Sequence, residues 1–126
     1  MNPAIEWRNV NEKRCLFLRF DGHFSAENAQ QAISTITSLV KKTAGRLTMV
    51  WECSDMAGYD TAAREAWQVF MKDMTNRTER IHLISDKVVI RSGAMVVGIF
   101  AGIKITTWAR LDDLLAHLEP PRRCSA

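Results

Sequence analysis

The chain has 126 residues, of which 47% are hydrophobic and 25% are charged, and its formal net charge is +3. This length suits one domain, and this composition excludes an intrinsically disordered chain. The basic residues are scattered among acidic ones and form no stripe interleaved with aromatic residues, which argues against nucleic-acid binding.

No segment of the sequence resembles a secretion signal or a membrane span. The first residues lack a charged segment followed by an apolar one, and the longest apolar run, residues 94–103, is shorter than the ~18 residues of a span. The cysteines Cys15, Cys53 and Cys124 have unrelated spacings, which argues against a disulfide framework. We therefore expect a cytoplasmic protein that is not transmembrane.

The first half of the chain predicts a hairpin, a helix and a buried strand. Residues 5–8 alternate apolar and polar side chains, and residues 15–20 form a second apolar segment that ends at Asp21-Gly22. Ser25 is a candidate N-cap for a helix that Gly45 ends, with an apolar stripe of Ala26, Ala29, Ile33, Ile36 and Val40. Residues 47–51 follow as a buried strand, and residues 52–59 as a polar loop.

The second half predicts three more helices and two more strands. A helix begins at Asp60-Thr61, and its apolar stripe is Ala63, Ala66, Trp67, Phe70 and Met74, which we assign to core packing. Strands are expected at residues 81–84 and 104–108, separated by a helix over Val88–Ala101. Residues 111–118 form the last helix, so the domain covers residues 1–119 and residues 120–126 form a flexible tail.

The predicted order is β-β-α-β-α-β-α-β-α. Strands that alternate with helices pair in parallel through right-handed crossovers, whereas the opening hairpin adds an antiparallel strand. The sequence therefore predicts the α/β class, with a single mixed sheet of about five strands and four helices.

Residues 47–63 run from the third strand through the polar loop into the second helix, with Asp60-Thr61-Ala62-Ala63 at the helix start. This segment, and the order of elements over most of the chain, resembles the STAS domains of bacterial anti-sigma-factor antagonists and sulphate transporters. The resemblance extends to the branch that shares features with lipid-binding Sec14-like proteins. It implies a STAS-like fold and a non-catalytic regulatory domain in signalling, whose partner is another protein such as a kinase.

The resemblance also implies roles for particular residues. In the family, an Asp-Ser-Ser-Gly-type motif opens this helix, and phosphorylation of the serine after the aspartate decides which partner is bound. Asp60 matches the aspartate and Thr61 the phosphoacceptor, whereas Ala62 and Ala63 replace the following Ser-Gly. The candidate partner-binding residues are Ser54, Asp55, Gly58, Tyr59, Asp60, Thr61 and Arg64.

A threonine at a helix N-terminus is physically suited to phosphorylation. Unpaired backbone N–H groups and the positive end of the helix dipole stabilise a phosphate there, and the phosphate adds a charge of about −1.5 to −2. The alternative is that Asp60 or Thr61 only caps the helix, which stabilises it by ~1 kcal/mol. The sequence leaves both interpretations open.

The helix predicted at Val88–Ala101 is apolar on every side, as expected of a helix that is buried or covered. Burial in the core, a subunit interface, a partner groove and a lipid-facing surface remain open. The candidate residues for an apolar interface or lipid contact are Met95, Val96, Val97, Ile99 and Phe100. The alternative function is therefore a carrier of a lipid or another small molecule, with this segment over an apolar pocket.

Acidic residues follow several predicted strands, where ligand sites of open α/β sheets gather. These residues, Asp21, Asp55, Asp60 and Asp86, are more typical of caps and turns, and the three histidines lack metal-ligand spacing. We therefore expect no metal, no cofactor and no enzymatic activity.

Overall fold

One mixed sheet of five strands organises the protein, whose structure, a computed structural model, describes residues 2–10 and 13–118. The strands are β1 (Ala4–Val10), β2 (Lys13–Phe24), β3 (Leu47–Tyr59), β4 (Thr78–Ile84) and β5 (Ile105–Trp108). They lie in chain order across the sheet, with β1 antiparallel to β2 and the other neighbours parallel. The predicted mixed sheet with an opening hairpin is confirmed. The predicted domain limit and the tail over residues 120–126 lie outside the described residues.

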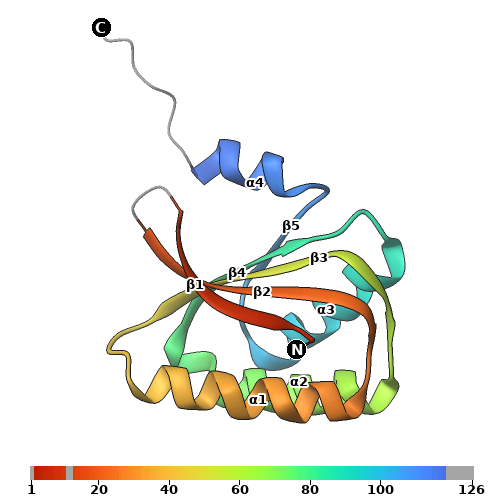
Figure 1. Cartoon of the computed structure of the whole chain (residues 1–126), viewed down its shortest axis with the longest axis horizontal. Helices are drawn as coiled ribbons and strands as arrows, with labels where there is room; N and C mark the ends of the chain where they lie inside the picture. Colours follow the sequence, from red (N-terminus) through yellow and green to blue (C-terminus); the bar gives the residue numbers. More distant parts are fainter. Residues whose placement is uncertain (1, 11–12, 119–126) are drawn as a thin grey trace, which may run out of the picture.

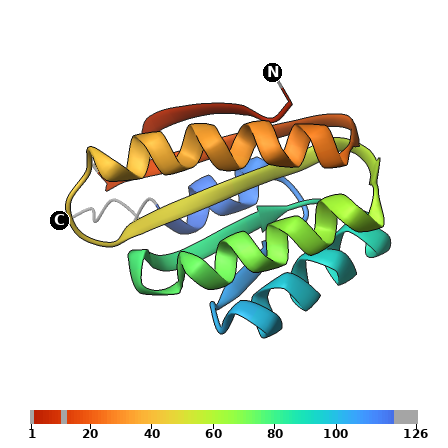
Figure 2. The same cartoon turned by 90° about the horizontal axis from the view of Figure 1, so that it is seen from below.

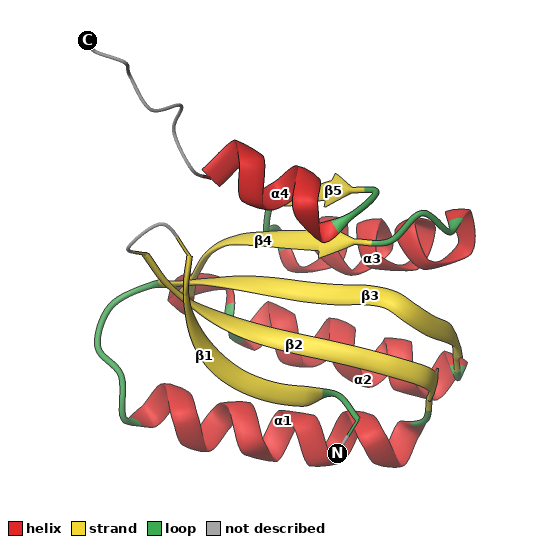
Figure 3. Cartoon of the chain, turned by 45° about the horizontal axis from the view of Figure 1, so that its top comes forward, coloured by secondary structure: helices red, strands yellow, loops and turns green. Residues whose placement is uncertain are grey.

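Three helices cover one face of this sheet: α1 (Ala26–Lys41), α2 (Thr61–Asp73) and α3 (Val88–Ala101) (Figures 1 and 2). Each helix connects two neighbouring parallel strands. Because such crossovers are right-handed, successive crossovers in one direction place their helices on the same face. The last helix, α4 (Leu111–Leu118), follows β5 and lies on the opposite face (Figure 3). A 3-10 turn, Thr75–Arg77, leads from α2 into β4.

Helix α1 begins where the sequence predicts and ends earlier. The Ser25 side chain accepts a hydrogen bond from the Asn28 backbone N–H at 3.1 Å, and the Asn28 side chain accepts one from the Ser25 N–H at 3.1 Å. This reciprocal capping box confirms Ser25 as the N-cap. The prediction that Gly45 ends the helix is wrong, because α1 stops at Lys41, where the Thr43 hydroxyl bonds to the Leu39 carbonyl.

Strands β2 and β3 are longer than predicted. The predicted loop over residues 52–59 is wrong, since β3 runs to Tyr59, and β2 likewise continues past Asp21 to Phe24. The two extensions pair with each other in parallel, with register shifts beyond Arg19 and beyond Gly22. Gly22 has a φ of 66°, which a glycine adopts without strain, so the ladder continues through these irregularities.

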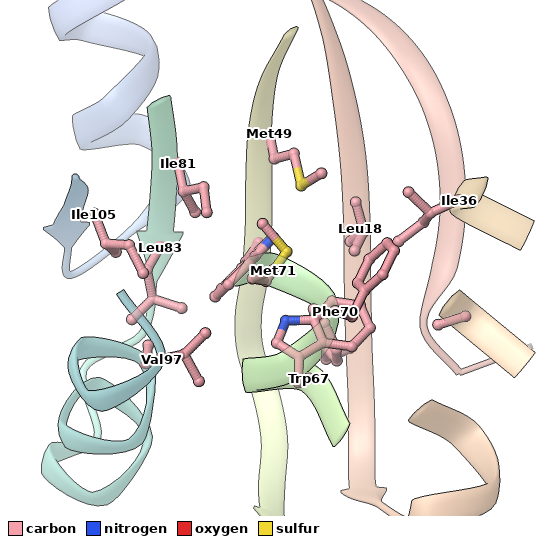
Figure 4. Packing of buried hydrophobic residues seen from close by; sticks show 14 of the residues in the cluster. Leu18, Ile36, Met49, Trp67, Phe70, Met71, Ile81, Leu83, Val97 and Ile105 are labelled. Carbon is pink, nitrogen blue, oxygen red and sulfur yellow. The ribbon is translucent and has the colours of Figure 1, made fainter. Parts of the chain in front are cut away.

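The main core lies between the sheet and α1, α2 and α3, with Trp67 of α2 near its centre (Figure 4). The Trp67 ring makes edge-on contacts with Phe20, Phe24 and Trp51, at centroid distances of 6.0, 5.6 and 5.9 Å. Its ring centroid also lies 5.5 Å from that of Phe70. The apolar stripe of α2 is therefore core packing, as predicted.

A smaller cluster lies under α4 on the other face of the sheet. Its buried members are Cys15, Phe17, Val50, Ile84 and Leu114. His82 of β4, which is 2% exposed, accepts a hydrogen bond at Nδ1 from the Trp108 indole N–H at 3.2 Å. Burial, and to a smaller extent the positive charges of neighbouring side chains, lowers the pKa of His82 to about 4.

We expect His82 to make stability depend on pH between about 6.5 and about 4. In this range the unfolded chain takes up a proton at His82 while the folded protein holds the ring neutral, because the folded pKa is the lower one. Stability from this group is therefore complete above pH 6.5 and falls as pH decreases, by at most about 1.4 kcal/mol per pH unit.

Urea titrations over this pH range measure the slope. The matched variant is His82→Asn, whose amide oxygen accepts the Trp108 hydrogen bond without titrating. Its unfolding free energy should change less with pH than that of the wild type. Equal slopes for the two proteins would contradict the assignment.

Candidate functional site

The start of α2 lies beside the start of α1, at the end of β2 and β3. Asp60 occupies the N-cap position of α2, and its carbonyl accepts the first helical hydrogen bond from the Arg64 N–H at 3.1 Å. Thr61 is the first residue of the helix, and its side chain is exposed. The structure therefore presents the candidate phosphoacceptor at a helix N-terminus on the surface.

The Asp60 carboxylate is used elsewhere. One oxygen lies 2.6 Å from His23 Nε2, and the other accepts a hydrogen bond from the Ala26 backbone N–H at 3.3 Å. It makes no capping hydrogen bond to the N–H groups of α2. Asp60 is therefore the N-cap residue of α2 but supplies no side-chain cap, because the first turn of α1 and the end of β2 offer donors that compete for this carboxylate.

The hydrogen bond from His23, followed by that from the Ala26 N–H, lowers the pKa of Asp60. The carboxyl group is therefore an anion at neutral pH. The backbone around it is also held, since the Asp60 N–H donates to the Phe24 carbonyl at 3.0 Å and the Asn2 amide donates to the His23 carbonyl at 3.2 Å. Asp60 thus connects the starts of two helices to the end of β2.

The candidate partner-binding residues fall into two groups. Gly58, Tyr59, Asp60, Thr61 and Arg64 lie at the β3–α2 junction, and all of them are at least partly exposed. Ser54 and Asp55 lie earlier on β3. Ser54 is five residues before Tyr59, the last residue of the strand, and five residues of a strand span about 16 Å.

The earlier group has its own contacts. Asp55 pairs with Arg19 at 3.1 Å, and the Ser54 hydroxyl donates to Glu52 at 2.6 Å. The Lys87 amine donates to the Met56 carbonyl at 2.8 Å, which fixes the strand beside α3. Since β3 is extended here, the structure does not bring Ser54 and Asp55 next to Thr61.

The Tyr59 side chain packs against α3. A Cβ atom added to Gly93 would clash with the Tyr59 hydroxyl oxygen, so the glycine leaves room for the ring in its present position. Gly93 thus allows close packing between α3 and this ring. Tyr59 is therefore a structural contact between the β3–α2 junction and α3 as well as a candidate partner-binding residue.

An apolar cavity of about 50 Å³ lies between the sheet, α2 and α3. It is lined by Phe20, Phe24, Trp51, Cys53, Met56, Tyr59, Arg64, Trp67, Leu83, Ile90, Gly93, Ala94 and Val97. Burial raises the pKa of the Cys53 thiol, which keeps it neutral. A dry cavity of about 150 Å³ admits benzene, so this smaller one does not favour the alternative of a lipid carrier.

The five candidate residues of α3 do not share one side of the helix. Met95, Val96, Ile99 and Phe100 are exposed, whereas Val97 is 3% exposed and lines the cavity. Val97 is therefore not part of an external interface, and as a candidate for lipid contact it faces the cavity instead. It belongs to the inner side of α3, because a residue one or two positions away on a helix points in a different direction.

The described residues contain no group of three or more His, Cys, Asp or Glu side chains placed to hold a metal ion. Two of the four predicted acidic residues pair with a basic side chain: Asp55 with Arg19, and Asp60 with His23. Among the described residues, none of the helices is both long and apolar enough to span a membrane.

Comparison with known proteins supports the fold. No protein-family model matches the chain, and no curated protein matches it in sequence. The chain is similar to the crystal structure of an uncharacterised protein of the DUF3478 family, with a SpoIIAA-like fold, from Shewanella loihica PV-4. The TM-score is 0.75 at 14% sequence identity, over 93% of each chain. At this identity the likeness shows the fold alone, and that fold is STAS-like, as the sequence predicts.

Proposed function

We propose that this domain is a cytoplasmic, non-catalytic regulatory module of the STAS type, which binds another protein and is switched by phosphorylation of Thr61. The observation that supports the switch is the position of Thr61, exposed at the first residue of α2 in a STAS-like fold. The contact surface is the β3–α2 junction, formed by Gly58, Tyr59, Asp60, Thr61 and Arg64.

The charges around Thr61 favour a phosphate there. The first turn of α2 contains no acidic residue, and the Asp60 carboxylate is engaged with His23 and Ala26 instead of the N–H groups of α2. A phosphate on Thr61 therefore meets the positive end of the helix dipole, which stabilises an anion by about 0.3–1 kcal/mol. Arg64, one helical turn later, adds a cation on the same side of the helix.

The switch follows from the change of charge. A phosphate adds about −1.5 to −2 charges to a surface that carries one anion, Asp60, and one partly exposed cation, Arg64. A partner that buries unmodified Thr61 must then desolvate this charge, whereas a partner with an arginine cluster gains charge-assisted hydrogen bonds. The modification thereby exchanges one class of partner for another.

We expect Thr61→Glu to weaken capture of the partner that binds unmodified protein by at least about tenfold, or about 1.4 kcal/mol. Thr61→Ala should retain that partner and lose the response to phosphorylation. The measurement is the affinity for a partner captured from the native cells, combined with native and denatured mass spectrometry that maps a phosphate-sized increment.

The control is Thr37→Glu, since Thr37 is an exposed threonine on α1 and receives the same change of charge. This variant should bind as the wild type does. An unmodified Thr61 in protein from native cells, together with equal capture by all variants, would overturn the proposed function. Equal circular dichroism spectra establish that the variants are folded.

A further inference from the structure

The outer side of α3 is the most apolar part of the described surface. Seven large hydrophobic side chains are exposed among the described residues, and six of them belong to α3. These six, called here the α3 face, are Val88, Val89, Met95, Val96, Ile99 and Phe100. Two of them are especially accessible, with Ile99 80% and Val88 78% exposed. A concentration of this kind marks an interaction surface.

The α3 face is separate from the residues that hold the helix on the sheet. Ile90, Ala94, Val97 and Ala101 are buried, and they fill the core side of α3. The exposed residues recur at helical spacing on the other side, where Ser92 is the polar exception. Since α3 lies at one end of the layer of three helices, its outer side has no neighbouring helix in the described structure (Figure 2).

The surroundings of the α3 face are mainly basic. The Lys72 amine of α2 lies 5.0 Å from the centroid of the Phe100 ring, and Lys104 is exposed just after the helix. At the other end, Lys87 and Arg91 donate to backbone carbonyl groups, and within the described residues neither forms a salt bridge. Helix α3 itself contains no acidic residue, and Asp86 is the acid nearest to it in sequence.

We propose that the α3 face binds an anionic lipid surface, with α3 lying in the plane of the membrane interface. Apolar side chains enter the boundary between headgroups and acyl chains, while the flanking lysines meet anionic headgroups. The helix has 14 residues, which amounts to about 21 Å, so it is shorter than the ~30 Å hydrocarbon core and cannot span it.

Charge complementarity favours a lipid surface over a second copy of the chain. In a symmetric pair, the same patch occurs on both subunits. Because both ends of α3 carry cations, two α3 faces in contact would bring like charges together whether the helices lie parallel or antiparallel. Anionic headgroups offer the opposite charge to both ends of the helix.

The test is co-sedimentation with phosphatidylcholine vesicles prepared with and without phosphatidylserine. We expect the protein to bind the vesicles that contain phosphatidylserine, and to bind less as the salt concentration rises. Ile99→Asp should weaken binding at least about tenfold, because it removes the most exposed apolar side chain from the membrane contact. Lys72→Glu with Lys104→Glu should weaken it by about fivefold for each lysine that is lost, or more.

Two variants serve as controls. Thr37→Asp places the same charge on α1, at the other end of the layer of helices, and Lys41→Glu changes an exposed lysine on the same helix (Figure 2). Both should bind less than threefold more weakly than the wild type. The proposal is overturned if the wild-type protein leaves both kinds of vesicle unbound, or if Ile99→Asp binds as tightly as the wild type. A dimer in sedimentation velocity that Ile99→Asp dissociates, without vesicle binding, would assign the α3 face to a second copy instead.

Discussion

Replacing Trp67 with alanine is expected to lower the free energy of unfolding by about 3–5 kcal/mol. Trp67 is 4% exposed, and its ring contacts aromatic rings from β2, β3 and α2. The substitution removes a large buried apolar area and several edge-on aromatic contacts, each of which adds about 0.5–1.5 kcal/mol. Because small domains have only about 5–15 kcal/mol of stability, this one change removes a large fraction of it.

Urea denaturation followed by far-UV circular dichroism measures the effect without depending on tryptophan fluorescence. The matched control is Val69→Ala, two residues away on the exposed side of α2, where we expect a change of less than about 0.5 kcal/mol. A loss of less than about 1 kcal/mol for Trp67→Ala would show that the aromatic cluster is not the centre of the core.

The second large effect is expected for Val97→Asp. Val97 is 3% exposed on the inner side of α3, next to the apolar cavity. An aspartate there would bury a carboxylate beside a cavity that is lined mainly by apolar side chains, so the folded state must either desolvate the charge or hold the group protonated. We expect a destabilisation on the order of 4 kcal/mol or more, or a chain that does not fold.

Ile99→Asp provides the comparison, because it introduces the same charge two residues later on the same helix. Ile99 is 80% exposed, so the free energy of unfolding of its variant should differ from that of the wild type by less than about 0.5 kcal/mol. Thermal and urea unfolding of the two variants, measured side by side, distinguish the inner from the outer side of α3. Equal destabilisation would contradict this orientation of the helix. A large difference also establishes Ile99→Asp as a folded variant for vesicle binding.

Much of the fold could be predicted from local patterns. The apolar stripe of α2, the Ser25 cap of α1 and the apolar length of α3 each depend on residues within one or two turns. The boundaries of β2 and β3 could not be predicted in this way. Their polar ends remain in the sheet because each strand pairs with the other, and this pairing joins residues more than thirty positions apart.

In the candidate site too, some features could be predicted from local sequence and others depend on tertiary contacts. The sequence places Thr61 at the start of a helix, and the structure adds that it is exposed. The sequence did not predict the bond between Asp60 and His23, which lie 37 residues apart, or the distance of Ser54 and Asp55 from the helix start. A contact of this kind has no signature in spacing or composition, since it depends on where the end of β2 and the start of α2 meet.

The sequence by itself therefore determined the order of elements, the helical core stripes and the class of fold. Periodicity carries this information because burying an apolar stripe stabilises an element whatever its neighbours are. Only the tertiary structure decided which side of α3 is buried, which donors the Asp60 carboxylate uses and how far the central strands extend. These features depend on which elements lie side by side. Because helix α3 is apolar on all sides, its sequence does not indicate which side is buried, and only packing against the sheet and α2 decides this.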